Sequence, residues 1–321
     1  MTTVVGQELT RSEARTDTAD YLQSPSNHLG QSRTSDSELF EPAPAAIGHV
    51  LSAESTLTVG QREHLLQWRI TTALLPTTML ACAMLWVTRN QMTIAQGELI
   101  VFAVAVAAVG SATIWHFTRF VHRCTYVGEE GIAIFELRRR PDAQPSSEVL
   151  LFKDAAELRA SQTRHTVNLR YTNTTYDYQW TDPVGRRFIR LKGKYVGKNR
   201  PPKAGDAFHF ASAAERAWSA HYLSRAERQL QEKSFIAFRV GVNRTVRIGF
   251  GFIEFHFDEE PVRIRREQIG KVALWRGMFS FIHNDAKWYR NSGKYRFHYG
   301  QVANAKVFLF VLEKLLGYRW D

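Results

Sequence analysis

The chain has 321 residues, and its 42 Lys and Arg against 31 Asp and Glu give a formal net charge of +11. It holds only two cysteines, which excludes the disulfide framework of small secreted domains. The charge is uneven: residues 1–67 carry four basic and nine acidic side chains, whereas residues 119–321 carry 36 basic and 21 acidic ones. The composition predicts an acidic N-terminal segment and a strongly basic body.

Residues 1–60 are polar and rich in Ser, Thr, Asp and Glu. They lack the basic start and the apolar stretch of a secretory signal. Because so few apolar side chains cannot offset the entropy lost on ordering, we predict that residues 1–60 form a disordered acidic tail.

Two uncharged apolar runs follow, at residues 70–88 and 99–118. As helices, each would span about 30 Å, the thickness of the hydrocarbon core of a bilayer. These runs predict a transmembrane helical hairpin over residues 61–121, with a pair of buried core helices as the alternative. Arginines are more frequent outside the pair than in the connecting loop. This asymmetry predicts a multi-pass protein of the cell (inner) membrane with both termini cytoplasmic.

The basic body is predicted to be α+β and to repeat one architecture. Short alternating segments from residue 122 predict strands, and a period of 3.6 over residues 210–233 then predicts a helix. The same order restarts at residue 234 and ends in a helix over residues 301–316. We therefore predict tandem domains at residues 122–233 and 234–321.

Four segments of this body carry a resemblance: YVGEEGI at 126–132, LFKDAA at 151–156, YTNTTY at 171–176 and AAERAW at 213–218. On these residues the chain resembles an uncharacterised family of bacterial membrane-anchored proteins with pleckstrin-homology-like (PH-like) domains. The resemblance implies two split β-barrels, each closed by a C-terminal helix, and it implies no catalytic residues. The basic loop of the phosphoinositide-binding eukaryotic relatives has no counterpart here.

Known catalytic patterns are missing from the sequence. It contains no GxSxG, HExxH or Walker A motif, and its eleven histidines show no metal-ligand spacing. His221 lies on the apolar stripe of the helix over residues 210–233, where it is predicted to face the core. We therefore predict a protein that is not an enzyme and that binds neither a cofactor nor a metal.

One stretch of the chain is basic without a single acid. On a strand, Arg190, Lys192 and Lys194 would project from one face while Ile189 and Leu191 enter the core. The stretch predicts contact with anionic lipid headgroups, and a merely solvated face is the alternative. Its candidate ligand-binding residues are Arg186, Arg187, Arg190, Lys192, Lys194, Lys198, Arg200 and Lys203.

The last helix is apolar on two sides. Besides a core stripe that includes Phe308 and Leu312, it carries Val307, Phe310 and Val311 on another side. A helix with two apolar sides is buried on both, which predicts docking to another membrane protein or to a second copy of the chain. The sequence as a whole thus predicts a membrane-anchored cytoplasmic binding or scaffolding module. A nucleic-acid ligand for the basic body is the alternative that the pattern favours less.

Overall fold

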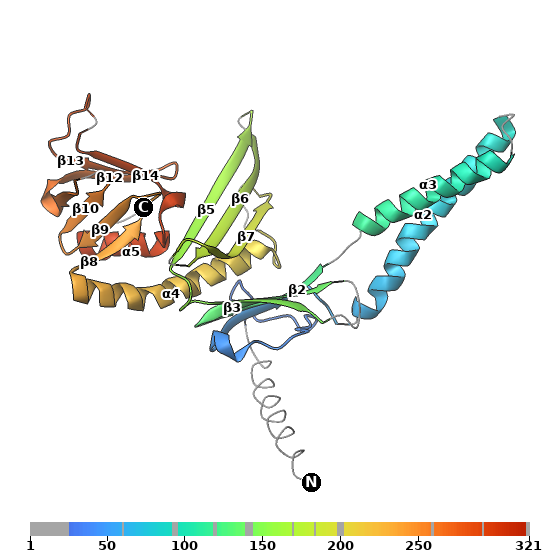
Figure 1. Ribbon diagram of the computed structural model, residues 1–321, viewed down its shortest axis with the longest axis horizontal. Helices are drawn as coiled ribbons and strands as arrows, with labels where there is room; N and C mark the ends of the chain where they lie inside the picture. Colours follow the sequence, from blue (N-terminus) through green and yellow to red (C-terminus); the bar gives the residue numbers. More distant parts are fainter. Residues whose placement is uncertain are drawn as a thin grey trace, which may run out of the picture.

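The computed structural model describes residues 26–59, 61–91, 96–117, 121–138, 144–168, 170–182, 184–197, 202–257, 260–290 and 292–318. These residues form four antiparallel sheets and four α-helices, together with three short 3₁₀ helices (Figure 1). The 3₁₀ helices are η1 (Ala45–Ile47), η2 (Arg266–Gln268) and η3 (Tyr299–Gln301).

The first half of the body contains two sheets and a long helix. The first sheet has the strand order β1-β2-β3-β4, and the second has the order β5-β6-β7. The helix α4 (Ala207–Lys233) follows them, as the 3.6 period at residues 210–233 predicted. The strands are β1 (Val50–Ser55), β2 (Val121–Gly128), β3 (Gly131–Arg138), β4 (Ser146–Leu151), β5 (Glu157–Val167), β6 (Arg170–Thr181) and β7 (Arg187–Tyr195).

The second half repeats this order of elements. A four-stranded sheet β11-β10-β9-β8 is followed by a three-stranded sheet β12-β13-β14 and by the helix α5 (Ala305–Leu316). Among the described strands no sheet closes into a barrel, so the predicted pair of split barrels is wrong. The strands are β8 (Phe235–Arg239), β9 (Thr245–Gly249), β10 (Phe252–His256), β11 (Val262–Arg265), β12 (Ile269–Trp275), β13 (Met278–His283) and β14 (Lys294–His298).

The two apolar runs form the helices α2 (Gln61–Gln91) and α3 (Gln96–Phe117), which project together away from the sheets (Figure 1). Over the residues that the structure describes, neither helix is both long enough and apolar enough to cross a membrane. In α2, threonines and Pro76 interrupt the apolar side chains. The predicted transmembrane hairpin is therefore wrong. The predicted multi-pass inner-membrane location and the predicted cytoplasmic placement of both termini depended on this hairpin and are wrong as well.

Small side chains hold α2 and α3 together. The hydroxyl of Thr77 lies 2.8 Å from that of Ser111. A Cβ atom on Gly110 would lie only 2.9 Å from Cγ2 of Thr77, so a glycine is needed where the helices cross. The outward side chains are apolar, and Met79 and Phe102 are each more than half exposed.

Residues from the predicted disordered tail complete the first sheet. β1 pairs with β2 from Val50↔Gly128 to Ser55↔Cys124, so the helical hairpin is an insertion between two neighbouring strands. Ile47 and Ala53 are fully buried in a small cluster beneath this sheet. The first structural unit therefore begins well before residue 122. Residues 1–25 of the predicted tail lie outside the described residues.

His28 fixes this N-terminal segment to the first sheet. Its ring nitrogens lie 2.8 Å from the hydroxyl of Ser52 and 2.9 Å from that of Thr125. The side chain is 2% exposed. Burial, with smaller contributions from the positive charges of His209 and Arg216, lowers the pKa of His28 to about 3.

Acidification should therefore weaken the fold through His28. The unfolded chain takes up this proton near the ordinary pKa of 6.5, and the folded chain only near 3, so stability present above pH 6.5 is lost as the pH falls. We expect about 2 kcal/mol of this loss between pH 7 and pH 5, at 1.36 kcal/mol per pKa unit. Urea unfolding at both pH values should show a smaller loss for His28→Asn, and an equal loss in both proteins would contradict the assignment.

One hydrophobic core runs through both halves. It joins Trp180 of β6 and Trp218 of α4 to Phe255 of β10 and Phe308 of α5, all at most 1% exposed. The two halves thus form one body, with α4 packed against both.

Candidate functional site

The structure places three of the predicted basic residues in one row. Arg190, Lys192 and Lys194 are exposed at alternate positions of β7, while Ile189, just before them, is 3% exposed. We call these three side chains the basic face. Alternate strand residues lie about 6.6 Å apart, so the row is about 13 Å long. Asp177 of the neighbouring strand accepts a hydrogen bond from Nε of Arg190 at 2.8 Å, which fixes that guanidinium.

The packing beneath the basic face depends on a glycine. Gly193 lies between the two lysines, opposite Tyr176 in the sheet. A Cβ atom at this position would lie 2.3 Å from the hydroxyl of Tyr176. Tyr176, Tyr178 and Trp180 of the neighbouring strand are all buried, so they form the core beneath β7.

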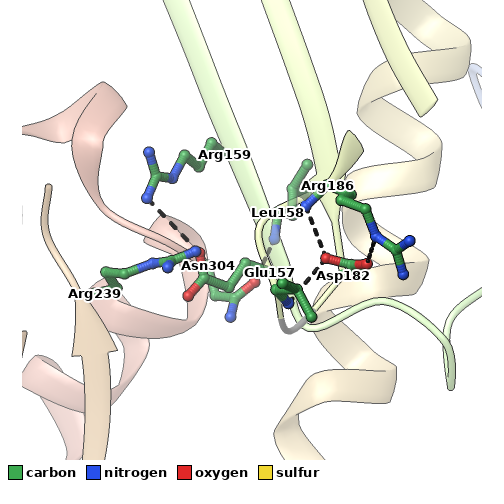
Figure 2. Close-up of polar contacts among 8 residues, drawn as sticks. Glu157, Leu158, Arg159, Asp182, Arg186, Arg239 and Asn304 are labelled. Carbon is green, nitrogen blue, oxygen red and sulfur yellow. Dashed lines mark hydrogen bonds and ion pairs between the residues drawn. The ribbon is translucent and has the colours of Figure 1, made fainter. Parts of the chain in front are cut away.

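The other basic candidates do not join the basic face. Arg186 donates from Nε to Oδ2 of Asp182 at 2.8 Å (Figure 2). Arg187 and Lys203 are exposed outside the row. Lys198 and Arg200 lie outside the described residues.

The predicted docking side of the last helix is mostly internal. Val307 and Val311 are 2% and 4% exposed and belong to the main core, so they are unavailable to a partner. Val307 and Val311 are thus covered within the chain, where α5 contacts α4 and β5 as well as β9. Only Phe310 is exposed, at 44%, and Nζ of Lys314 lies 5.6 Å from its ring centroid.

A cleft with a volume of about 1310 Å³ lies between the two halves. The second half of α4, from Ala217 to Lys233, forms its floor. The turn between β2 and β3 and the segment after β4 form one wall, and β8 forms the other. At its base His221 stacks on Trp218 with ring centroids 6.3 Å apart, and its Nδ1 lies 3.6 Å from Oε2 of Glu130.

The cleft is lined by charged side chains. Glu157 pairs with Arg239 across the two halves, with Oε2 2.7 Å from Nη2 (Figure 2). No ion pair within the described part of the chain engages the other lining cations, which are Lys153, Arg225, Arg228 and Lys233. The floor on α4 thus carries Arg225, Arg228 and Lys233 together with Glu232, and Lys153 lies on the wall.

A buried asparagine joins the walls of the cleft. Oδ1 of Asn304 accepts hydrogen bonds from the backbone N–H of Leu158 at 2.9 Å and from Nε1 of Trp218 at 2.8 Å. Its own backbone N–H donates to the carbonyl of Leu158 at 2.7 Å. Figure 2 shows Asn304 beside β5, next to the pair formed by Glu157 and Arg239. This set of contacts fixes the second half against the edge of the first half's sheet.

A second buried contact reinforces the same joint. Nζ of Lys306 lies 2.6 Å from Oε2 of Glu215, and Glu215 is 5% exposed. Burial raises the pKa of Glu215, and the neighbouring Lys306 opposes that rise. The contacts of Asn304 and the pair formed by Glu215 and Lys306 thus hold the two halves together beside the cleft.

Sequence patterns missed the cleft altogether. Leu158 and Asn304 are 146 residues apart, and nothing in the local pattern around either one indicates the other. Asn304 has a positive φ of 56°, a conformation that Asn adopts more readily than most other residues. An Asn in the sequence is only a weak indication of such a conformation.

Comparisons with known proteins add no assignment. No protein-family model matches the chain, and no curated protein is significantly similar to it. Within the described residues, no group of three or more His, Cys, Asp or Glu side chains could hold a metal ion.

Proposed function

We propose that this protein is a binding module that takes a phosphate-bearing ligand on the basic face of β7. The observation that carries the proposal is the row of Arg190, Lys192 and Lys194, exposed on a strand whose other side packs against the core through Ile189, Leu191 and Tyr195. Asp177 accepts a hydrogen bond from Arg190, and Glu54, Glu136, Glu148 and Asp206 line a pocket of about 280 Å³ together with Arg190 and Lys192. Lys194 is exposed and is not part of that lining.

The shape of the basic face favours repeated phosphates over a single small anion. Three cations spaced about 6.6 Å apart along a straight strand cannot converge on one phosphate. They can contact several phosphates in a row, as on a headgroup layer or a polyphosphorylated small molecule. Because all three cationic side chains are exposed, affinity should be electrostatic and should fall as salt rises.

Binding by the full-length chain tests this proposal. We would compare vesicles of phosphatidylglycerol and phosphatidylcholine with vesicles of phosphatidylcholine alone, and with inositol hexakisphosphate in solution. Replacing Lys192 and Lys194 with Gln should weaken binding to anionic vesicles about tenfold or more, since each cation near such a surface contributes about 1 kcal/mol. Binding to neutral vesicles measures the contribution of the exposed apolar side chains of α2 and α3, and it serves as the baseline.

A matched variant separates the site from the total charge. Lys271→Gln with Lys314→Gln removes two exposed charges from the second half and should leave binding unchanged. If both double variants lose binding to anionic vesicles equally, the basic face is only a solvated surface. Preference for duplex DNA over both phosphate ligands would instead favour nucleic-acid binding.

A further inference from the structure

The loop between β13 and β14 contains a turn whose two central residues are aromatic. The N–H of Arg290 donates to the carbonyl of Lys287 at 3.1 Å, which closes a β-turn with Trp288 and Tyr289 at its centre. Such positions usually hold Gly, Asn, Asp, Ser or Pro, because these residues suit the backbone of a turn. The loop projects beyond the sheets of the second half (Figure 1). The turn therefore carries two large rings on a projecting loop.

Both rings are exposed. Trp288 is 89% exposed and Tyr289 is 59% exposed. They pack edge-to-face on each other, with ring centroids 5.6 Å apart and an interplanar angle of 82°. Trp and Tyr side chains are mostly buried when they contribute to a fold, so these two add little to the core. Large apolar side chains that gather on an exposed surface mark a contact with something outside the chain.

Hydrogen bonds hold this turn in one conformation. Nζ of Lys294 donates to the carbonyl of Trp288 at 2.8 Å. At the base of the loop, the N–H of His283 donates to the carbonyl of Gly293 at 2.9 Å. The rings are thus presented on an ordered turn, which lowers the entropy that a binding partner would have to offset.

Cations flank the two rings. Lys287 and Arg290 occupy the first and last positions of the turn, and both are exposed. The guanidinium carbon of Arg290 lies 5.8 Å from the ring centroid of Tyr289. Residues 284–294 carry three basic side chains and one acidic side chain, Asp285. The adjacent η2 adds one charge of each sign, on Arg266 and Glu267. The surface around the rings is therefore positively charged.

The two rings offer too little area for a stable protein interface. An aromatic side chain carries about 150–250 Å² of surface, so the exposed parts of Trp288 and Tyr289 amount to about 300 Å². A specific protein interface takes about 800 Å² from each partner. A lipid surface, in contrast, accepts single aromatic side chains between its headgroups, where an indole or a phenol keeps its polar atom hydrated. The positive flanks favour anionic lipids.

We propose that the turn of residues 287–290 is an interfacial anchor, which inserts Trp288 and Tyr289 between the headgroups of an anionic lipid surface. The rings lie at the boundary between headgroups and acyl chains, and Lys287 and Arg290 contact the phosphates. This anchor rests on the proposed function, with lipid headgroups rather than a soluble polyphosphate as the source of the phosphates. It adds a second contact in the other half of the chain from the basic face of β7.

A fluorophore at the turn measures insertion in the full-length chain. We would attach an environment-sensitive nitrobenzoxadiazole label to Tyr289→Cys in a Cys82→Ser background, in which the remaining Cys124 is buried. With vesicles of phosphatidylglycerol and phosphatidylcholine, we expect a blue shift of the emission and quenching by lipids that carry a spin label near the top of the acyl chain. The same label on Trp275→Cys, at the β12–β13 turn on the opposite end of that sheet, should stay in water.

The label distinguishes the anchor from the basic face. If the chain binds anionic vesicles while the label at position 289 stays in water, the anchor is wrong and the basic face stands. If Lys192→Gln with Lys194→Gln leaves binding unchanged while the label still inserts, the basic face is wrong and the anchor stands. A chain that does not bind anionic vesicles at all would overturn the anchor as well.

A substitution of Trp288 gives a second readout. Trp288→Ala should lower the affinity for anionic vesicles about tenfold, because most of the apolar surface of this ring leaves water on insertion. Trp275→Ala is the matched control, since Trp275 is also 67% exposed, and it should leave the affinity unchanged. Both rings are exposed, so both variants should fold, and circular dichroism verifies this. If Trp288→Ala abolishes self-association in sedimentation and leaves vesicle binding intact, the turn is a contact between copies of the chain and the anchor is overturned.

Discussion

Replacing Asn304 with Ala is expected to lower the free energy of unfolding by about 3–5 kcal/mol. The substitution removes the acceptor of two buried donors, the N–H of Leu158 and Nε1 of Trp218, and each unsatisfied buried donor costs about 1–3 kcal/mol. Alanine must also adopt the positive φ of 56° at this position, which costs about 1–2 kcal/mol. Urea or guanidinium unfolding of the full-length chain measures the sum.

Two control variants divide this loss into its parts. Asn243 has the same φ of 56° but is exposed, so Asn243→Ala should show the backbone strain alone. Asn304→Gly removes the acceptor without the strain and should be more stable than Asn304→Ala by about 1 kcal/mol. If Asn304→Ala costs no more than Asn243→Ala, the hydrogen bonds that link the two halves contribute nothing.

The elements that sequence could predict are those whose pattern is local. Tyr176, Tyr178 and Trp180 alternate on β6 and are buried together, because a strand turns alternate side chains to one face. Trp218 and Tyr222 were predicted on one apolar stripe of a helix, and both are buried in α4, because residues about 3.6 positions apart share a helix face. The basic face follows from the same alternation on β7.

What sequence could not predict depends on distant partners. β1 looked like part of a polar tail because its pairing strand, β2, lies beyond the helical hairpin. Val307 and Val311 looked available for a partner because periodicity shows that a side is apolar but not what covers it. The apolar runs at α2 and α3 likewise predicted helices correctly, whereas run length alone was a poor guide to membrane crossing.

The packing of α5 is the second feature with a large expected effect. Phe308 is fully buried, and its ring makes edge contacts with Phe238 and Phe279 at centroid distances of 5.1 and 5.2 Å. Phe308→Ala should lower the free energy of unfolding by about 3–5 kcal/mol, since it removes the buried ring and leaves a cavity. Denaturant unfolding of the full-length chain measures this loss.

Phe310 is the matched control on the same helix. It is the same residue type two positions away, but it is 44% exposed and contacts Lys314 at the surface. Phe310→Ala should therefore cost about 1 kcal/mol or less, because little of its ring leaves water when the chain folds. Both substitutions delete the same atoms and change helix propensity equally. The difference between their effects on the free energy of unfolding therefore depends only on the orientation of the helix. Equal losses would mean that α5 is rotated from the orientation in which Val307 and Val311 are covered, and that side of the helix would again be open to a partner.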